Sequence, residues 1–189
     1  LTEWKEKVAD LKITSVKTKI AIVGKYVSLR DSYISLVEAI KHAGGANKTG
    51  IDLKWIDSET LTDKNVAEKL KDADGIIIPG GFGTRGVEGM ICACKYAREN
   101  KVPYLGICLG MQVTVIEYAR DVLGIKDATS GEFSESGSHV IDILPDKKGK
   151  KIGGTMRLGA YPCALKDGTK IKEACGRFRI NRKPKARFS

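Results

Sequence analysis

The segment 102–112 constrains the fold of this chain more than any other, because it reads as a strand that turns sharply into a helix. Apolar residues dominate positions 102–107 and predict a short buried strand, and a helical pattern follows. Gly106 and Gly110 lie two residues before and two residues after Cys108. This G-x-C-x-G spacing is typical of a nucleophile elbow, a strained turn so close to other chain segments that side chains at the glycine positions would clash.

Cys108 would then point out of the sheet at the N-terminus of a helix. There the helix dipole and free N–H groups favour thiolate over thiol and can also hold an oxyanion. The alternative is that Cys108 is a small buried hydrophobe, as most cysteines in apolar runs are. The two flanking glycines and the change from strand to helix favour a reactive thiol.

Length and composition predict one soluble domain. The chain has 189 residues, of which 42% are hydrophobic and 30% charged, so it is not a disordered or collagen-like chain. No apolar run approaches the roughly 20 residues that cross a bilayer, and the N-terminus has no signal-peptide core. We therefore expect no membrane association and a cytoplasmic location.

The net charge of +10 is a local feature. Six basic residues and no acidic ones lie between positions 177 and 189 and supply more than half of the excess. No recognised nucleic-acid module accompanies this charge, so we do not expect specific nucleic-acid binding.

The five cysteines predict reduced thiols. Their number is odd, and no two of them have the C-x-x-C spacing. Cys92 and Cys94 would face different sides of one helix, and the chain has only two histidines. We therefore expect no metal site.

Strands alternate with helices along the first two thirds of the chain, which predicts an α/β fold with an open, mostly parallel, doubly wound sheet and helices on both faces. The first helix is predicted to stop at Gly44–Gly45. Ligands of such sheets bind beyond the C-terminal strand ends, so the loops after Val23, Ile78 and Ile107 should converge. The predicted strands are 20–23, 51–56, 75–79 and 102–107, with weaker ones at 139–144, 154–158 and 163–165. The predicted helices are 32–42, one that starts at 62 or 63 and runs to 71, and 88–100.

The loop 80–86 is rich in glycine and invites comparison with a phosphate-binding P-loop. The Gly-Lys-Ser/Thr ending of a P-loop is missing, so this interpretation fails.

Four runs together resemble the glutaminase domain of the CTP synthase family, a class I glutamine amidotransferase with a flavodoxin-like fold. The elbow alone would indicate only the amidotransferase class, and the other three runs narrow the resemblance. The runs are Val23-Gly-Lys-Tyr-Val-x-Leu-x-Asp-Ser-Tyr33, Pro79-Gly-Gly-Phe-Gly-x-Arg-Gly86, Tyr104-Leu-Gly-Ile-Cys-Leu-Gly-Met-Gln112 and Gly153-Gly-Thr-Met-Arg-Leu-Gly159.

The resemblance implies that Cys108 attacks the side-chain amide of glutamine, forming a glutamyl thioester and releasing ammonia. It places oxyanion donors at the backbone N–H groups of Gly81 and Leu109. Glu132, which by itself reads as a solvated loop carboxylate, would pair with the substrate α-ammonium. The residues implied to bind glutamine are Gly81, Leu109, Gly110, Met111, Gln112, Glu132 and Arg177, and those implied to bind the activator GTP are Phe82, Arg85 and Arg157.

The same resemblance implies that the ammonia aminates UTP to CTP on an ATP-dependent amidoligase (synthase) domain. ATP, Mg and UTP would bind only there, and the full-length protein would be a homo-oligomer. In this interpretation residues 1–18 are a helix and connector that form an interdomain linker, 19–176 are the glutaminase domain with its C-terminal part missing, and 177–189 are a basic tail of uncertain origin.

The match breaks at the catalytic base. The family supplies histidine and glutamate from a His-Pro-Glu-Phe run that this sequence does not contain, and neither His42 nor His139 matches that position. Residues 176–181 resemble a remnant of the preceding segment. The alternative to a glutaminase is therefore a catalytically incomplete domain that binds glutamine or a partner.

Overall fold

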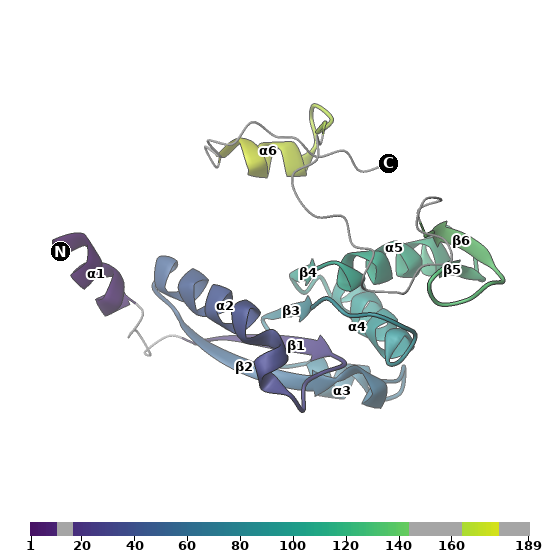
Figure 1. The fold of residues 1–189 in the computed structure, drawn as a ribbon, viewed down its shortest axis with the longest axis horizontal. Coiled ribbons are helices and arrows are strands. Elements are labelled where there is room, and N and C mark those ends of the chain that lie inside the picture. Colours follow the sequence, from purple (N-terminus) through teal and green to yellow (C-terminus); the bar gives the residue numbers. More distant parts are fainter. Residues whose placement is uncertain (11–16, 144–163, 178–189) are drawn as a thin grey trace. The chain divides into compact units, whose positions relative to one another are not determined.

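The computed structural model describes residues 1–10, 17–143 and 164–177 (Figure 1). The chain divides into two compact units, residues 1–148 and residues 149–189. The first unit begins with helix α1 (Thr2–Asp10) and contains the sheets, and the second contains helix α6 (Lys170–Arg177). Each unit is described by itself.

Four parallel strands form the main sheet of the first unit, in the order β2-β1-β3-β4. Ile22 in the centre of β1 pairs with Trp55 of β2 on one side and with Ile77 of β3 on the other. The predicted strand–helix alternation is confirmed, and the order reverses between β1 and β3. The strands are β1 (Lys17–Gly24), β2 (Gly50–Asp57), β3 (Gly75–Ile78) and β4 (Tyr104–Gly106).

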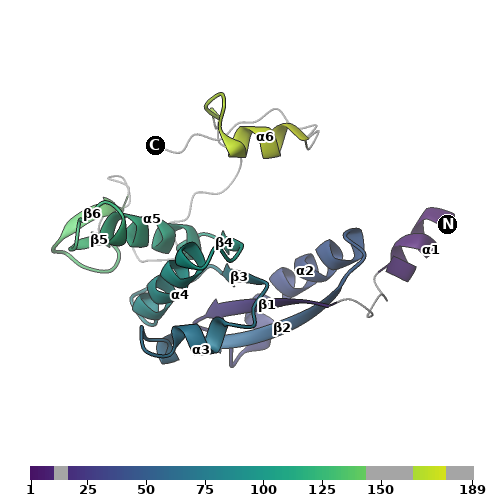
Figure 2. The same ribbon diagram turned by 180° about the vertical axis from the view of Figure 1, so that it is seen from behind.

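Helices cover both faces of this sheet, as the sequence predicted. Helix α2 lies on one face, whereas α3 and α4 lie on the other (Figures 1 and 2). Helix α5 packs against α4, β3 and β4. Short 3-10 turns η1 (Arg30–Tyr33) and η2 (Ser58–Thr60) precede α2 and α3. The helices are α2 (Ile34–Ala46), α3 (Val66–Leu70), α4 (Val87–Glu99) and α5 (Leu109–Asp121).

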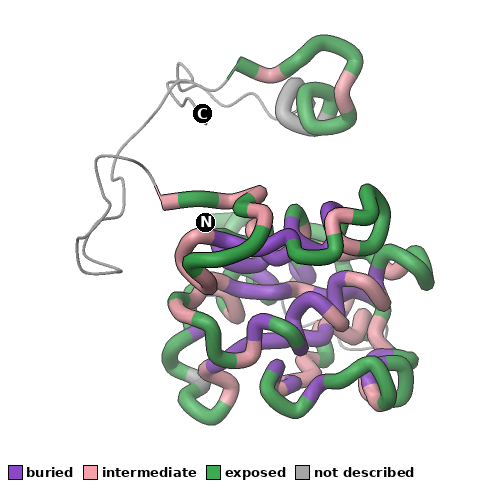
Figure 3. The backbone as a smooth tube through the Cα atoms, turned by 90° about the vertical axis from the view of Figure 1, so that its right-hand side faces the viewer, coloured by how far each residue is buried: buried purple, intermediate pink, exposed green. Residues whose placement is uncertain are grey.

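Successive residues of β1 supply two different apolar layers. Ala21 and Val23 are fully buried in a core shared with α3, α4 and α5. Ile22 is also fully buried but lies outside that core, because alternate side chains of a strand point to opposite faces of the sheet. Ile40 of α2 is likewise buried outside that core. Figure 3 shows the buried stretches within the strands and the inner sides of the helices. This burial on both faces explains the continuous apolar character of the central strands.

A second, two-stranded sheet follows α5. Strands β5 (Ala128–Ser130) and β6 (Ser138–Ile141) pair in parallel and pack against α5. The predicted strand at 139–144 corresponds to β6, whereas the predicted strand at 154–158 lies outside the described residues.

Two local predictions were wrong. Helix α2 does not stop at Gly44–Gly45 but continues to Ala46, because a Cβ built at Gly44 would lie 2.7 Å from Ile51 Cγ1, so glycine serves close packing there. The strand before the elbow is not uniformly buried. Leu105 is 54% exposed because, among the described strands, β4 pairs only with β3.

A buried ion pair joins α4 to α5. The Glu117 side chain is 1% exposed, and both Nε and Nη2 of Arg98 donate hydrogen bonds to it, the shorter at 2.7 Å. This partner raises the pKa of the Arg98 guanidinium. An uncompensated Glu117 carboxylate would be left in the core if the arginine were removed.

We predict that Arg98→Met destabilises the fold by about 3 kcal/mol, because it leaves the Glu117 carboxylate unpaired. The double variant R98M/E117L should recover most of this loss, because it removes both charges. Denaturant unfolding of the two variants and the wild type measures the difference. A double variant that is less stable than Arg98→Met would contradict this account.

Candidate active site

Cys108 occupies a strained turn between β4 and α5. Its backbone has φ 55° and ψ −105°, a conformation that residues with a side chain rarely adopt, and it is the N-cap of α5. The Gln112 N–H donates to the Cys108 carbonyl at 3.1 Å, which starts the helix directly after the cysteine. Cys108 is an exposed free thiol. The sharp turn that the sequence predicted is therefore confirmed.

The glycines around Cys108 allow backbones to approach closely. A Cβ built at Gly110 would lie 2.1 Å from the Ile78 carbonyl oxygen, and one built at Gly106 would lie 2.5 Å from the Gly110 carbonyl carbon. No flexible side-chain end is involved, so neither clash could be relieved without moving the backbone. Only glycine at both positions lets α5 begin against the end of β3.

The glycine-rich loop 80–86 lies directly beside this turn. A Cβ built at Gly80 would be 3.5 Å from the Cys108 Cβ, and one built at Gly81 would be 3.2 Å from a methyl carbon of Leu109. The loops after β3 and β4 therefore meet at Cys108, as the sequence predicted.

Lys25 connects the loop after β1 to the glycine-rich loop after β3. It was not among the residues singled out in the sequence. The residue is 2% exposed. Its ammonium donates to the Phe82 carbonyl at 2.8 Å and to the Gly83 carbonyl. Burial lowers the pKa of this ammonium, and the nearby Glu132 carboxylate opposes that effect. A lysine after a strand is usually a solvated residue, and no pattern in the sequence distinguishes this one.

Glu132 reaches the same loop from the segment after β5. One oxygen of its carboxylate, Oε1, accepts a hydrogen bond from the Gly83 N–H at 2.7 Å. The Glu132 N–H in turn donates to Ser130 Oγ at 3.2 Å. Glu132 is therefore partly buried beside the loop, and is not the freely solvated carboxylate of the alternative interpretation.

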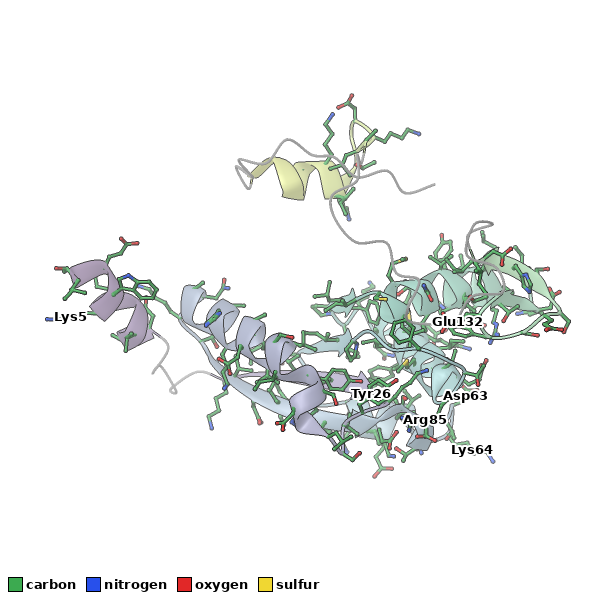
Figure 4. The ribbon with its side chains drawn as sticks, viewed as in Figure 1. Lys5, Tyr26, Asp63, Lys64, Arg85 and Glu132 are labelled. Atoms are coloured by element: carbon green, nitrogen blue, oxygen red, sulfur yellow. The ribbon has the colours of Figure 1, made fainter. Side chains whose placement is uncertain are left out.

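Arg85 is engaged within the site. Its guanidinium donates to the Glu59 carboxylate and, at 2.9 Å, to the Lys25 carbonyl, and it lies 5.6 Å from the centre of the Tyr26 ring. Figure 4 labels Tyr26, Arg85 and Glu132, which come from three different loops. Phe82 is 43% exposed. Both side chains are exposed, but the Arg85 guanidinium already has partners within the protein.

The remaining residues singled out in the sequence lie on the first turn of α5, in the second unit, or outside the described part. Met111 is exposed, whereas Gln112 is partly buried on the first turn of α5. Arg177 is the last residue of α6 in the second unit, and Arg157 lies outside the described residues.

The two histidines both lie at exposed positions of the first unit. His42 is exposed on α2. His139 is exposed on β6, with Nε2 2.8 Å from the Ser134 carbonyl oxygen. The His139 ring therefore uses one of its two nitrogens, Nε2, on a backbone carbonyl. In the described part of the chain, no helix is long and apolar enough to span a bilayer.

Comparison with known proteins defines the class. The family described as "Glutamine amidotransferase class-I" matches residues 28–179. The chain belongs to the class I glutamine amidotransferase family, and its parallel sheet with flanking helices matches the fold of that family.

Within that family the chain is similar to CTP synthases. It is 56% identical to the CTP synthase of Geobacillus kaustophilus over 178 residues, which are 93% of this chain and 34% of that protein. It is 53% identical to the CTP synthase of Carboxydothermus hydrogenoformans over 190 residues, 100% of this chain and 36% of that protein. The chain thus spans about a third of the length of these relatives.

A solved structure is also similar. The glutaminase domain of Trypanosoma brucei CTPS, with bound acivicin, superposes with a TM-score of 0.68 at 41% sequence identity. The match covers 76% of this chain and 56% of that one.

We predict that Cys108→Gly is more stable than Cys108→Ala by about 1 kcal/mol. Glycine relieves a backbone strain of roughly 1–3 kcal/mol and loses only about 0.5–1 kcal/mol through its greater freedom in the unfolded chain. Denaturant unfolding of the two thiol-free variants measures the difference. As a control, Lys54→Gly on β2 should be less stable than Lys54→Ala. If alanine were the more stable residue at position 108 as well, the turn would not be strained.

Proposed function

We propose that this chain is the glutaminase domain of a CTP synthase and that Cys108 is its nucleophile. The observation that carries the proposal is an exposed thiol, held at positive φ at the N-terminus of α5 and in contact with a glycine-rich loop. Membership of the amidotransferase family gives this arrangement its chemistry.

In the proposed reaction the Cys108 thiolate attacks the side-chain carbonyl carbon of glutamine. The resulting oxyanion receives hydrogen bonds from the N–H groups of Gly81 and Leu109. The proposal is supported by Leu109 being the first residue of α5, where N–H groups have no intrahelical partner, and by Gly81 packing against it. The C–N bond then breaks, and the amide NH2 group leaves as ammonia after it gains the proton that the Cys108 thiol gave up. Water hydrolyses the glutamyl thioester to glutamate and regenerates the thiol.

Glu132 would bind the α-ammonium of glutamine. Its placement beside the glycine-rich loop, with a second carboxylate oxygen to offer, supports this role. Gly110, Met111 and Gln112 would line the side of the substrate nearest α5, and Arg177 would pair with its carboxylate.

The wider reaction is proposed from the relatives. Ammonia would aminate UTP to CTP on an amidoligase domain that holds ATP and Mg, in a cytoplasmic homo-oligomer. GTP would activate hydrolysis through Phe82, Arg85 and Arg157. Because Arg85 forms an ion pair with Glu59, a GTP phosphate would compete with that carboxylate for the guanidinium.

The second candidate is a domain that binds glutamine without turning it over. It is favoured by His139, whose ring nitrogen Nε2 contacts the Ser134 backbone carbonyl. Both candidates share the thiol, and they differ in proton transfer to the departing ammonia.

We predict that a glutamine-mimicking diazo ketone labels Cys108 of the 189-residue chain, whereas the chain releases little ammonia from glutamine. Intact-mass spectrometry and an ammonia assay measure the two results. Cys108→Ser is the matched control and should not be labelled. Rapid glutamine hydrolysis by this chain would contradict the assignment of the missing base, and a wild-type chain that the diazo ketone leaves unlabelled would contradict the proposed nucleophile.

A further inference from the structure

Gly83 is held at both of its backbone polar groups. Its N–H donates to Oε1 of Glu132 at 2.7 Å, and its carbonyl accepts from the Lys25 ammonium. The same ammonium also donates to the Phe82 carbonyl at 2.8 Å. Two oppositely charged side chains, from the loops after β1 and β5, therefore bind the backbone of Gly83 in the glycine-rich loop.

These hydrogen bonds, rather than packing, fix this part of the loop. Gly83 has φ +71°, and a Cβ built on it would meet no atom within 4 Å. A glycine in open space has the freest backbone of any residue, so it adopts one conformation only where its polar groups are bound. The tip of the loop consequently depends on its two charged partners.

The lysine also supports the proposed oxyanion donor. A Cβ built at Gly81 would lie 3.6 Å from Cδ and from Cε of Lys25, so the aliphatic stem of the lysine packs against Gly81. The charges that act on the ammonium are Glu132 and Glu59, which favour the charged form, and Arg85, which disfavours it. A buried ammonium needs hydrogen-bond partners, and the loop carbonyls supply them.

We propose that Lys25 is a positioning residue that fixes the glycine-rich loop against Cys108, and that Glu132 has a second role as its counterpart on the Gly83 N–H. The effect of this loop position on catalysis rests on the proposed function. Oε1 of Glu132 holds the loop while Oε2 is left for the α-ammonium of glutamine, so one carboxylate couples substrate recognition to the position of the oxyanion donor.

The two roles of Glu132 can be separated by substitution. Glu132→Gln keeps an oxygen that accepts from the Gly83 N–H but loses the charge that attracts an ammonium. Glu132→Ala loses both. Lys25→Met keeps the length of the lysine stem and removes its charge. Lys54→Met is the matched control, because Lys54 is a lysine that forms an ion pair with Asp72, outside the loop.

Amide hydrogen exchange of the full chain without ligand tests whether Lys25 and Glu132 hold Gly83. We call these two side chains and their hydrogen bonds to the loop the clamp. Lys25→Met and Glu132→Ala should raise exchange at residues 81–84 roughly tenfold, the effect of losing one hydrogen bond to a charged group, whereas Glu132→Gln and Lys54→Met should leave it within about twofold of wild type. Unchanged exchange in β1 and β3 shows that the fold is intact. If Lys25→Met does not fold, Glu132→Ala still tests the proposal, because it removes the partner of the Gly83 N–H. Wild-type exchange of the loop in Lys25→Met or Glu132→Ala would overturn the proposal.

The kinetics of Cys108 labelling by the diazo ketone test the coupling. Lys25→Met should lower the maximal labelling rate roughly tenfold with little change in the half-saturating concentration, whereas Glu132→Gln should chiefly raise that concentration. Equal effects of the two variants on both parameters would overturn the division of roles. A wild-type chain that is not labelled, with loop exchange behaving as expected, would instead sink the proposed function and leave the clamp standing.

Discussion

The close approach of α5 to the end of β3 is the constraint on which the rest of this site depends. The Ile78 carbonyl lies so near Gly110 that no side chain fits between them. Helix α5 can therefore begin immediately at the strand edge, and Cys108 is forced into a positive-φ conformation with its thiol exposed. The same proximity brings the glycine-rich loop after β3 beside the thiol, so one contact between backbones sets the positions of both proposed catalytic parts.

Charged side chains fix the part of the glycine-rich loop that this backbone contact does not hold. The glycine-rich loop has few side chains with which to pack, and the Lys25 ammonium and the Glu132 carboxylate hold its carbonyl and N–H groups instead. Arg85 ties the end of the same loop to Glu59 and to the Lys25 backbone. The loop thus combines little packing with well-placed polar anchors, so its position depends on these charged side chains.

The sequence predicted those features that have a local cause. Glycine at 106 and 110 signals a backbone clash between near neighbours, and the apolar periodicity signals strands and helices, so the elbow and the parallel sheet could both be predicted. Lys25 could not, because its burial arises from a loop 57 residues away in the chain. For the same reason the end of α2 was misplaced: Gly44 packs against Ile51 of the next strand, and the sequence alone cannot tell such a glycine from a helix stop. Leu105 was predicted as buried because the pattern does not reveal which strand lies at the edge of a sheet.

The central claim is that one carbonyl group meets the Cys108 thiol at its carbon and the backbone N–H groups of Gly81 and Leu109 at its oxygen. A crystal structure of the chain after reaction with the glutamine-mimicking diazo ketone tests this most directly. The account predicts a covalent bond to Cys108 Sγ, with the adduct carbonyl oxygen about 2.7–3.1 Å from both N–H nitrogens. An adduct whose oxygen points into solvent, out of hydrogen-bonding reach of Gly81 and Leu109, would contradict it.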